Sequence, residues 1–257
     1  MIDIHNHLLS GMDDGPNDPD ETMAMCRLAA EDGIRVIAAT PHLADGQFIN
    51  NPDEIISAVT SLNRLVIEAG LNLRIVPGME VRVAPDLVEK LRSGRILPLN
   101  QGRYVLLDLH PAHLAPGLAR LLKKVGSAGY GIVLGHLEKN IPIQENPEHV
   151  YELLKELPPW RLVLQISADS LLGEAGSAAL KTAKILLRHN LAHVIATDAH
   201  SSRVRLPRLS LALRVAERVV GKDRARMMAR EIPLAILRDR NFPGPSEPIR
   251  PKSWWRR

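Results

Sequence analysis

The chain opens with MIDIHNHLLSGMDDGP (residues 1–16), a short strand pattern followed by a polar loop. Alternate residues of a strand face the same side, so His5 and His7 can direct two imidazoles at one point. Asp13 and Asp14 follow in the loop, ahead of a Gly-Pro turn. Imidazole and carboxylate ligands together suit zinc, manganese or iron. A His-x-His pair alone is more often a chance pattern than a metal site, so the prediction depends on partners elsewhere in the chain.

Length and composition favour one large domain without a nucleic-acid or membrane-spanning region. A chain of 257 residues can bury a sizeable core, and its 33 basic and 29 acidic side chains leave a net charge of only +4. No basic run is long enough to predict nucleic-acid binding. The single cysteine, Cys26, excludes an intrachain disulfide and is expected to be buried in a helix. No secretory signal or membrane-spanning run is recognised, so we expect a soluble, cytoplasmic protein.

Short apolar runs alternate with longer amphipathic segments along the chain. Seven strands are predicted, over residues 2–4, 36–40, 73–79, 104–109, 131–135, 162–166 and 193–197. Helices are predicted over residues 18–33, 51–70, 85–93, 116–128, 147–157, 176–190 and 207–221, with two short ones in 222–238. The alternation implies an α/β fold with a parallel sheet, either open and doubly wound or closed into a barrel. In both folds the functional residues collect at the carboxyl ends of the strands.

The last residues differ in composition from the rest of the chain. Residues 241–257 are rich in proline and basic groups and lack periodicity. We therefore expect a single domain of residues 1–240 followed by a mobile, disordered tail. Trp254 and Trp255 could anchor the tail to a partner, but an unpacked tail is the simpler interpretation.

Six of the seven predicted strands end in a histidine or a carboxylate. With the first loop, these positions supply nine metal-ligand candidates: His5, His7, Asp14, His42, Glu80, Asp108, His136, Asp198 and His200. A metal centre at the mouth of a barrel explains this placement, because the strand ends converge there. Nine donors exceed the roughly four to six ligands of one ion, so two or three metal ions are expected, with Glu80 as a bridge. Clustered ions of this kind are typical of phosphoryl transfer to water.

Five segments of the chain match one family in order and spacing. They are MIDIHNHLLSGMDDGP at 1–16, ATPH at 39–42, GMEVRVAPD at 78–86, GHLEKN at 135–140 and VIATDAH at 194–200. The chain resembles the polymerase and histidinol phosphatase (PHP) superfamily of metallohydrolases. Within that superfamily it resembles the bacterial protein-tyrosine phosphatases encoded with capsule and exopolysaccharide genes. The similarity covers about residues 1–240.

The resemblance implies a distorted, TIM-like (β/α)7 barrel with a trinuclear metal site. It places every candidate above except Asp108 on a ligand position of the family. Asp108 stands where the subgroup typically has Glu, so one metal is expected to be bound more weakly or at a shifted position. Lys139 stands where an Arg that contacts phosphate is usual, and Lys keeps the charge but loses the bidentate fork.

The expected activity is that of a phosphoric monoester hydrolase, in which a metal-activated water attacks phosphotyrosine in line. Lys139 and Arg205 are the candidates for phosphate contact, with Arg203 as a weaker one. A cysteine-based phosphatase mechanism is excluded, because Cys26 has no C-x5-R loop around it. A phenolate with a pKa of about 10 is a fair leaving group, so a strong general acid is not required.

Several other polar residues receive smaller roles. Asp13 is expected to orient a ligand histidine, and Asp169 to cap a loop. His110 and His113 are candidates for the lip of the substrate site. The remaining histidines, His149, His189 and His193, are expected to be surface residues.

The leading expectation is an enzyme that dephosphorylates a bacterial tyrosine kinase controlling capsule or exopolysaccharide synthesis. A flexible phosphotyrosine-containing tail would dock at the barrel mouth. Manganese is the expected metal, with iron or zinc as alternatives. Two other functions stay open: a small-molecule phosphatase of the histidinol-phosphate type, and a non-catalytic metal-binding relative. Amphipathic segments such as residues 21–31 could pair subunits into a homo-oligomer.

Overall fold

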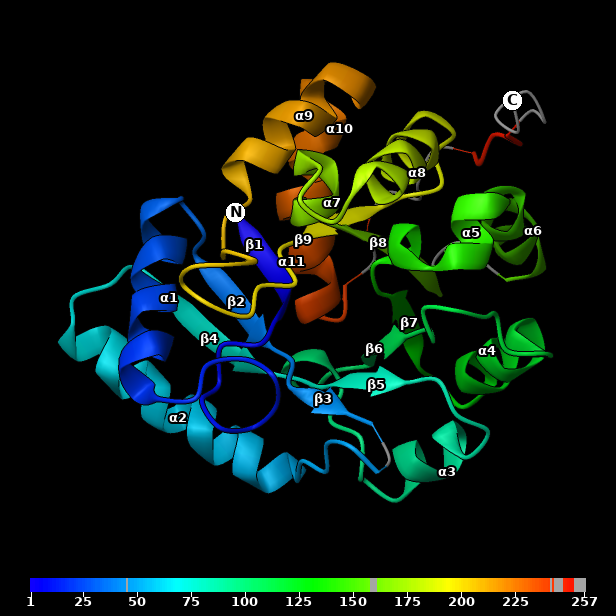
Figure 1. Cartoon of the computed structure of the whole chain (residues 1–257). Helices are drawn as coiled ribbons and strands as arrows, with labels where there is room; N and C mark the ends of the chain where they lie inside the picture. Colours follow the sequence, from blue (N-terminus) through cyan, green and yellow to red (C-terminus); the bar gives the residue numbers. More distant parts are fainter. Residues whose placement is uncertain (45, 158–160, 241, 243–246, 252–257) are drawn as a thin grey trace.

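The computed structural model describes residues 1–44, 46–157, 161–240, 242 and 247–251. Figure 1 shows strands gathered at the centre of the molecule, with helices around them. None of the described helices combines the length and the apolar character that a bilayer span requires.

In the part of the chain that the structure describes, nine parallel strands form two sheets. The first has the order β1 (Ile2–Asn6), β2 (Val36–Ala39), β4 (Arg74–Pro77). The second has the order β3 (His42–Leu43), β5 (Glu80–Arg82), β6 (Tyr104–Asp108), β7 (Gly131–Leu134), β8 (Leu162–Ser167), β9 (Val194–Ala196). The predicted α/β fold with parallel strands is confirmed.

Two of the seven predicted strands are each followed, after a short break, by a second strand that was not predicted, and this explains why nine strands are observed in the described residues. Thr40 and Pro41 separate β2 from β3, while Gly78 and Met79 separate β4 from β5. The predicted strand over residues 73–79 was therefore wrong at its end: Glu80 does not follow that strand but begins β5, where it pairs with His42 of β3. Both breaks change the direction of the chain just before a candidate ligand, His42 in β3 and Glu80 in β5.

The last strand returns to the first, so the seven strand positions follow one another in a ring. The Asp198 amide donates to the His5 carbonyl at 2.9 Å, and the His7 amide donates to the Ala199 carbonyl at 2.9 Å. Two residues before His5 in β1, the buried Asp3 carboxylate accepts from the Thr197 amide at 2.9 Å. The Asp3 side chain thus takes the place of a backbone acceptor between β1 and β9. The barrel is distorted where these two strands meet.

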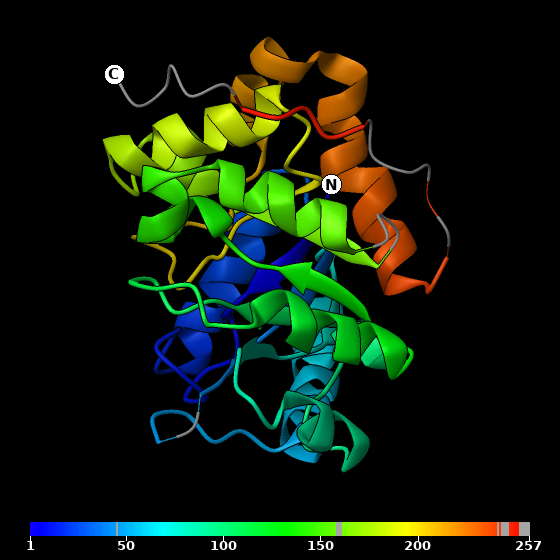
Figure 2. The ribbon, with the colours of Figure 1, turned by 90° about the vertical axis from the view of Figure 1, so that its right-hand side faces the viewer.

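Helices surround the ring, and the last of them, α11, lies at one end of it (Figures 1 and 2). They are α1 (Pro19–Glu31), α2 (Pro52–Glu68), α3 (Leu87–Arg92), α4 (Leu118–Ser127), α5 (Ile141–Glu145), α6 (Glu148–Glu156), α7 (Ala168–Leu172), α8 (Ser177–Arg188), α9 (Ser210–Val220), α10 (Lys222–Arg226) and α11 (Ile232–Leu237). Short 3-10 turns span Leu99–Gln101 and Leu137–Lys139, and a π-helical turn spans Met227–Glu231. The two short helices α5 and α7 were not predicted.

The helix caps and the apolar helix face that the sequence predicted are present in the structure. Asp18 caps α1 by accepting from the Glu21 amide at 2.8 Å, and Asn51 caps α2 by accepting from the Asp53 amide at 2.9 Å. The buried face of α2 consists of Ile55, Val59, Leu62 and Val66, as its spacing predicted. Cys26 is buried in α1 as expected.

Two apolar layers hold the ring in place. The outer layer lies between the strands and the surrounding helices. The inner layer fills the ring with small and branched side chains: Ile2, Ile4, Ala38, Val76, Leu106, Val133, Val163 and Val194. Ile232 and Ile236 of α11 join this inner layer, so the helix packs against the end of the ring that includes Ile2. The opposite ends of the strands are left for polar residues.

Part of the predicted tail packs against the domain. The Ile249 amide donates to the His189 carbonyl at 2.8 Å, and the Arg250 side chain contacts Glu148 of α6 with its Nε at 2.5 Å. Over Glu247–Pro251 the chain therefore differs from the unpacked tail that its composition predicted. Trp254 and Trp255 lie outside the described residues.

Candidate metal centre

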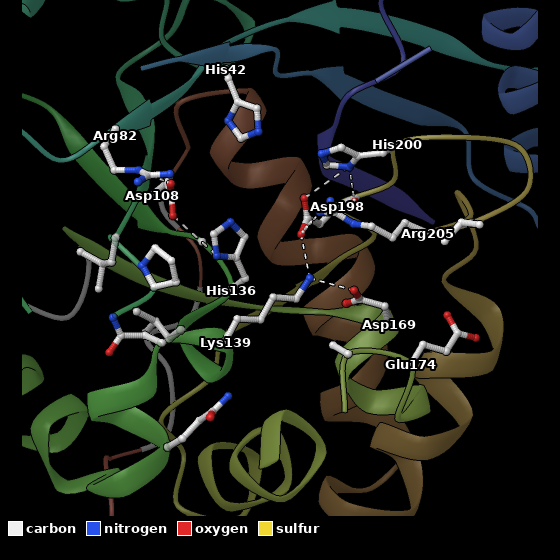
Figure 3. Close-up of a pocket in the computed structure, with 18 residues that line it drawn as sticks. His42, Arg82, Asp108, His136, Lys139, Asp169, Glu174, Asp198, His200 and Arg205 are labelled. Carbon is white, nitrogen blue, oxygen red and sulfur yellow. Dashed lines mark hydrogen bonds and ion pairs between the residues drawn. The ribbon is translucent and has the colours of Figure 1, made fainter. Parts of the chain in front are cut away.

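All nine ligand candidates meet at the carboxyl ends of the strands. They come from β1 and the loop after it, from β3, β5 and β6, and from the segments that follow β7 and β9. Five of them line one pocket of about 570 Å³, which also contains Lys139 and Arg205 (Figure 3). Residues up to 195 positions apart in the chain, His5 and His200, thus contribute to a single site.

Glu80 lies at the centre of this group. Its Oε1 is 2.7 Å from His136 Nε2, and its Oε2 is 2.9 Å from His42 Nδ1. The same Oε2 lies 3.3 Å from His5 Nε2 and 3.4 Å from His7 Nε2. A fully buried carboxylate with both oxygens facing imidazoles has the position that a bridging ligand needs.

The donor atoms fall into four groups, each compact enough to hold one ion. The groups are His7 with Asp14, His42 and His200; His5 with His7 and Glu80; His5 with His136 and Asp198; and Glu80 with Asp108 and His136. Within each group the donor atoms lie within 4.8 Å of one another. Because the groups share members, they describe a cluster of neighbouring cation positions.

Two buried atoms without hydrogen-bond partners show that the residues fit such ions. Glu80 Oε2 and His200 Nε2 are both buried, and neither forms a well-aligned hydrogen bond with another described residue, although His42 Nδ1 lies 2.9 Å from the first atom and Asp14 Oδ1 lies 3.3 Å from the second. Buried polar atoms are normally paired, and an orphaned pair among imidazoles and carboxylates is explained by cations that these atoms would coordinate. His5 Nε2 and His7 Nε2 also face each other at 3.1 Å, an arrangement suited to binding one cation between them.

Two buried polar residues fix the first two histidines. Gln165 Oε1 lies 2.8 Å from His5 Nδ1, so it accepts that proton and leaves Nε2 free to bind a metal. Asp13 Oδ2 lies 2.6 Å from His7 Nδ1 and also accepts from the His42 amide at 3.0 Å. Asp13 therefore has the contact with a ligand histidine that was predicted for it. Gln165 was missed, although a glutamine inside the apolar run of β8 was a usable signal.

The two predicted phosphate-contacting residues both reach the pocket. Lys139 Nζ lies 2.8 Å from Asp169 Oδ2 and 3.0 Å from Asp198 Oδ2, and Arg205 donates to the same Asp198 oxygen at 2.6 Å (Figure 3). The other Asp198 oxygen faces His5 Nε2 at 3.4 Å. Asp198 thus separates the imidazole cluster from two cationic side chains.

Asp169 and Arg82 are pocket residues whose place the sequence reasoning missed. Asp169 was predicted to cap a loop; it does accept from the Ser170 amide at 2.7 Å, but its other oxygen holds Lys139. Arg82 Nε contacts Asp108 Oδ2 at 2.5 Å, which fixes the shorter carboxylate beside His136. Asp108 Oδ1 remains 3.8 Å from His136 Nδ1.

The carboxylates make the cluster attractive to positive charge. Burial alone would lower the pKa of His7, but Asp13 and Glu80 raise it to about 9. Burial likewise opposes protonation of His136, whose pKa the Glu80 carboxylate raises to about 9. The pKa of Asp198 is held well below its usual range, since His5 and Lys139 outweigh its burial. The same fields that protonate the imidazoles would favour divalent cations in their place.

The remaining polar candidates lie outside the cluster. Arg203 is exposed and does not line the pocket. His110 and His113 are exposed and stack on each other with ring centroids 4.0 Å apart, next to Pro111 at the pocket edge. His193 was wrongly predicted to be a surface residue: it is buried directly before β9, where its Nδ1 accepts from the Leu164 amide at 3.1 Å.

Comparisons with known proteins agree on one family. A family model described as "Capsular polysaccharide synthesis, CpsB/CapC" matches residues 1–238. Tyrosine-protein phosphatase YwqE from Bacillus subtilis is 32% identical over 250 residues, covering 97% of each chain. Tyrosine-protein phosphatase CpsB from Streptococcus pneumoniae is 27% identical over 245 residues, covering 93% of this chain and 99% of its own.

Solved structures give the same result. A structure from a study of YwqE from B. subtilis and CpsB from S. pneumoniae, described there as metal-dependent tyrosine phosphatases, aligns with a TM-score of 0.92 and 32% identity. It covers 98% of this chain and 100% of its own. Histidinol phosphate phosphatase from Lactococcus lactis aligns with a TM-score of 0.57 at 18% identity, covering 89% and 94%, which is a likeness of fold.

Proposed function

Because the chain belongs to the CpsB/CapC family of capsular polysaccharide synthesis, we propose that it is a metal-dependent protein-tyrosine phosphatase. Its relatives YwqE and CpsB are named as tyrosine-protein phosphatases, and they match it over nearly their whole length. The observation that carries the proposal is the buried Glu80 at the centre of five histidines and three aspartates, next to two cationic side chains. A site of this composition can hold several cations and a phosphate together.

The protein's own residues prepare the site for a phosphate group. Lys139 has three N–H groups, of which Asp169 and Asp198 accept two, so the third is available to a phosphoryl oxygen. Arg205 lies on the other side of Asp198 and offers its remaining donors to the same ligand. Carboxylates around Lys139 raise its pKa despite its burial, which keeps it a cation at neutral pH.

The nine candidate ligands His5, His7, Asp14, His42, Glu80, Asp108, His136, Asp198 and His200 would hold two or three divalent ions. Bound ions would lower the pKa of water enough to supply a nucleophile at neutral pH, together with positive charge for the phosphoryl oxygens. We propose manganese as the metal, with iron and zinc as alternatives, because mixed imidazole and carboxylate sets suit all three.

The proposed substrate is a phosphotyrosine-containing tail of a bacterial tyrosine kinase that regulates capsule or exopolysaccharide synthesis. The cytoplasmic location and a homo-oligomeric assembly belong to the same proposal. A small-molecule phosphatase of the histidinol-phosphate type is less well supported, because the similarity to such an enzyme extends to the fold alone.

The test is turnover by chelated and metal-reloaded protein. We expect hydrolysis of a phosphotyrosyl peptide that chelation abolishes and Mn²⁺ restores, with histidinol phosphate turned over far more slowly. His136→Ala should abolish turnover while Arg203→Ala, an exposed residue outside the pocket, should not. Absence of aryl phosphate hydrolysis by reloaded wild type would contradict the proposal.

A further inference from the structure

The described surface has a second hollow, between α3 and α4. One cavity of about 650 Å³ is lined by these two helices, and another of about 270 Å³ adjoins it. Pro85, Arg120, Leu121 and Lys124 line both cavities, so the two form a single groove, which we call the basic groove. Figure 1 shows α3 and α4 next to each other at the edge of the molecule, beyond the end of β5.

Positive charge dominates the basic groove. Arg92, Arg120, Lys123 and Lys124 are exposed along it, against one lining carboxylate, Glu89. Lys123 is engaged by Glu156 of α6 at 2.9 Å. None of the other three cations forms an ion pair with another residue that the structure describes. Surface cations without intramolecular partners are available to an acidic ligand.

The floor of the basic groove is apolar. Val88 and Leu121 lie between the charged side chains, and Val83 and Leu118 line the narrower end. An apolar floor between cations fits a polypeptide, whose alternate side chains would meet the floor and the charges in turn. This composition favours an acidic peptide over a polyanion without apolar side chains.

The basic groove starts beside the metal centre. Val83, which lines the groove, directly follows Arg82, which lines the metal-site pocket. The Val83 amide donates to the Asp108 carbonyl at 2.9 Å, so the two cavities share one wall at the ends of β5 and β6. A peptide with its phosphotyrosine in the pocket would therefore pass over this wall into the groove.

We propose that the basic groove binds an acidic stretch of the phosphoprotein substrate, located to one side of the phosphotyrosine. This inference rests on the proposed phosphatase function, which it deepens by naming a property of the substrate. Acidic side chains would pair with Arg92, Arg120 and Lys124 and guide the phosphotyrosine toward the pocket. Since the pairs are exposed, each contributes modestly and the sum is sensitive to salt.

The experiment compares matched phosphotyrosyl peptides with the metal-loaded enzyme. The peptides differ only in a run of Glu or Gln, placed on the amino or the carboxyl side of the phosphotyrosine. At low salt, we expect the Glu run on one side of the phosphotyrosine to raise kcat/KM by roughly threefold to tenfold over the matched Gln peptide. This increase should come from a lower KM. The variant Arg92→Gln/Arg120→Gln/Lys124→Gln should lose this preference and keep its activity on p-nitrophenyl phosphate.

A second variant with the same change in charge is the control. Arg214→Gln/Arg218→Gln/Lys222→Gln removes three exposed cations from α9 and α10, away from the groove, and should keep the preference. Equal use of Glu and Gln peptides by wild type, or equal loss of preference in both variants, would overturn the proposal.

A binding measurement separates this inference from the phosphatase activity. If no aryl phosphate is hydrolysed, fluorescence anisotropy of the labelled, unphosphorylated Glu peptide still tests the groove. Binding by wild type that the α3 and α4 variant loses would support the groove; identical binding by both would overturn it.

Discussion

Lys139 shows how much of the chemistry depends on single contacts. A lysine at this position offers a point charge without the fixed fork of an arginine, so its direction must come from its neighbours. Asp169 and Asp198 supply that direction, at 2.8 and 3.0 Å from Nζ. Asp169 is thus a positioning residue for the phosphate contact that we propose for Lys139.

Substitutions test this role. Lys139→Met should raise KM for a phosphotyrosyl peptide by about tenfold to a hundredfold, because one charge-assisted hydrogen bond to the phosphate is lost. Asp169→Asn should raise KM less, and should have little further effect in the Lys139→Met background, because it acts through the lysine. Steady-state kinetics of the double-mutant cycle measure this coupling, and fully additive effects would show that Asp169 acts independently.

Residue types and spacing were enough to name the nine candidates that the fold brings together, since each lies at or just after the end of a predicted strand or in the first loop. Gln165 in β8 and Asp169 in α7 were harder to predict as site residues, because β8 carries no ligand candidate and both side chains act through residues of other elements. Long-range pairs of this kind leave no periodic trace in a single sequence.

At the scale of elements, the loop after β1 depends on one glycine. A Cβ added to Gly15 would lie 2.0 Å from the His7 carbonyl oxygen and 3.0 Å from Asp13 Oδ1. The contact is with backbone of a metal-ligand candidate, so the loop that carries Asp13 and Asp14 would have to move.

Gly15→Ala should therefore destabilise the protein by about 1–3 kcal/mol and weaken metal binding. Gly126→Ala is a suitable control, because its added Cβ would meet Arg161 at an ordinary 3.5 Å within helix α4. Urea denaturation and metal titration of both variants check the prediction. If Gly15→Ala matched wild type in both measurements, the close approach would not matter.

His193 makes the pairing of β8 and β9 sensitive to pH. Burial, with Arg224 nearby, lowers its pKa to about 4, from about 6.5 in an unfolded chain. The unfolded state therefore binds the proton more readily between these values. The stabilising contribution is complete above pH 6.5 and is lost as the pH falls toward 4, by about 3 kcal/mol.

His193→Asn should flatten this part of the stability profile, because Asn can still accept from the Leu164 amide but does not titrate. Denaturant unfolding of wild type and variant between pH 4 and 7 measures the difference. Parallel profiles for the two proteins would rule out His193 as the titrating group.

The alternation of strands and helices could be predicted from the sequence, although it left an open sheet and a closed barrel as alternatives. The breaks between β2 and β3 and between β4 and β5 could not be predicted. Thr40-Pro41 and Gly78-Met79 read as strand ends, and only their packing shows that the chain resumes as β3 and β5. Gly78 allows close packing there, because an added Cβ would lie 2.9 Å from the Leu99 side chain and 3.4 Å from its Cα.

For the whole molecule, metal binding and stability should be linked. The cluster concentrates buried carboxylates and imidazoles, and bound ions would neutralise the carboxylates. After loss of the metal, like charges would repel one another or the side chains would take up protons. Chelation should lower Tm by roughly 5–10 °C, and Mn²⁺ should restore it. Calorimetry of the apo and reloaded protein checks this, and an unchanged Tm would show that the cluster is stable without ions.

Our central claim is that side chains from most strands of the ring hold several ions together around Glu80. Elemental analysis of the purified protein after equilibration with Mn²⁺, beside Glu80→Gln, tests this claim most directly. We predict at least two ions per chain in wild type and fewer in the variant. Less than one ion per wild-type chain, or equal content in the two proteins, would contradict it.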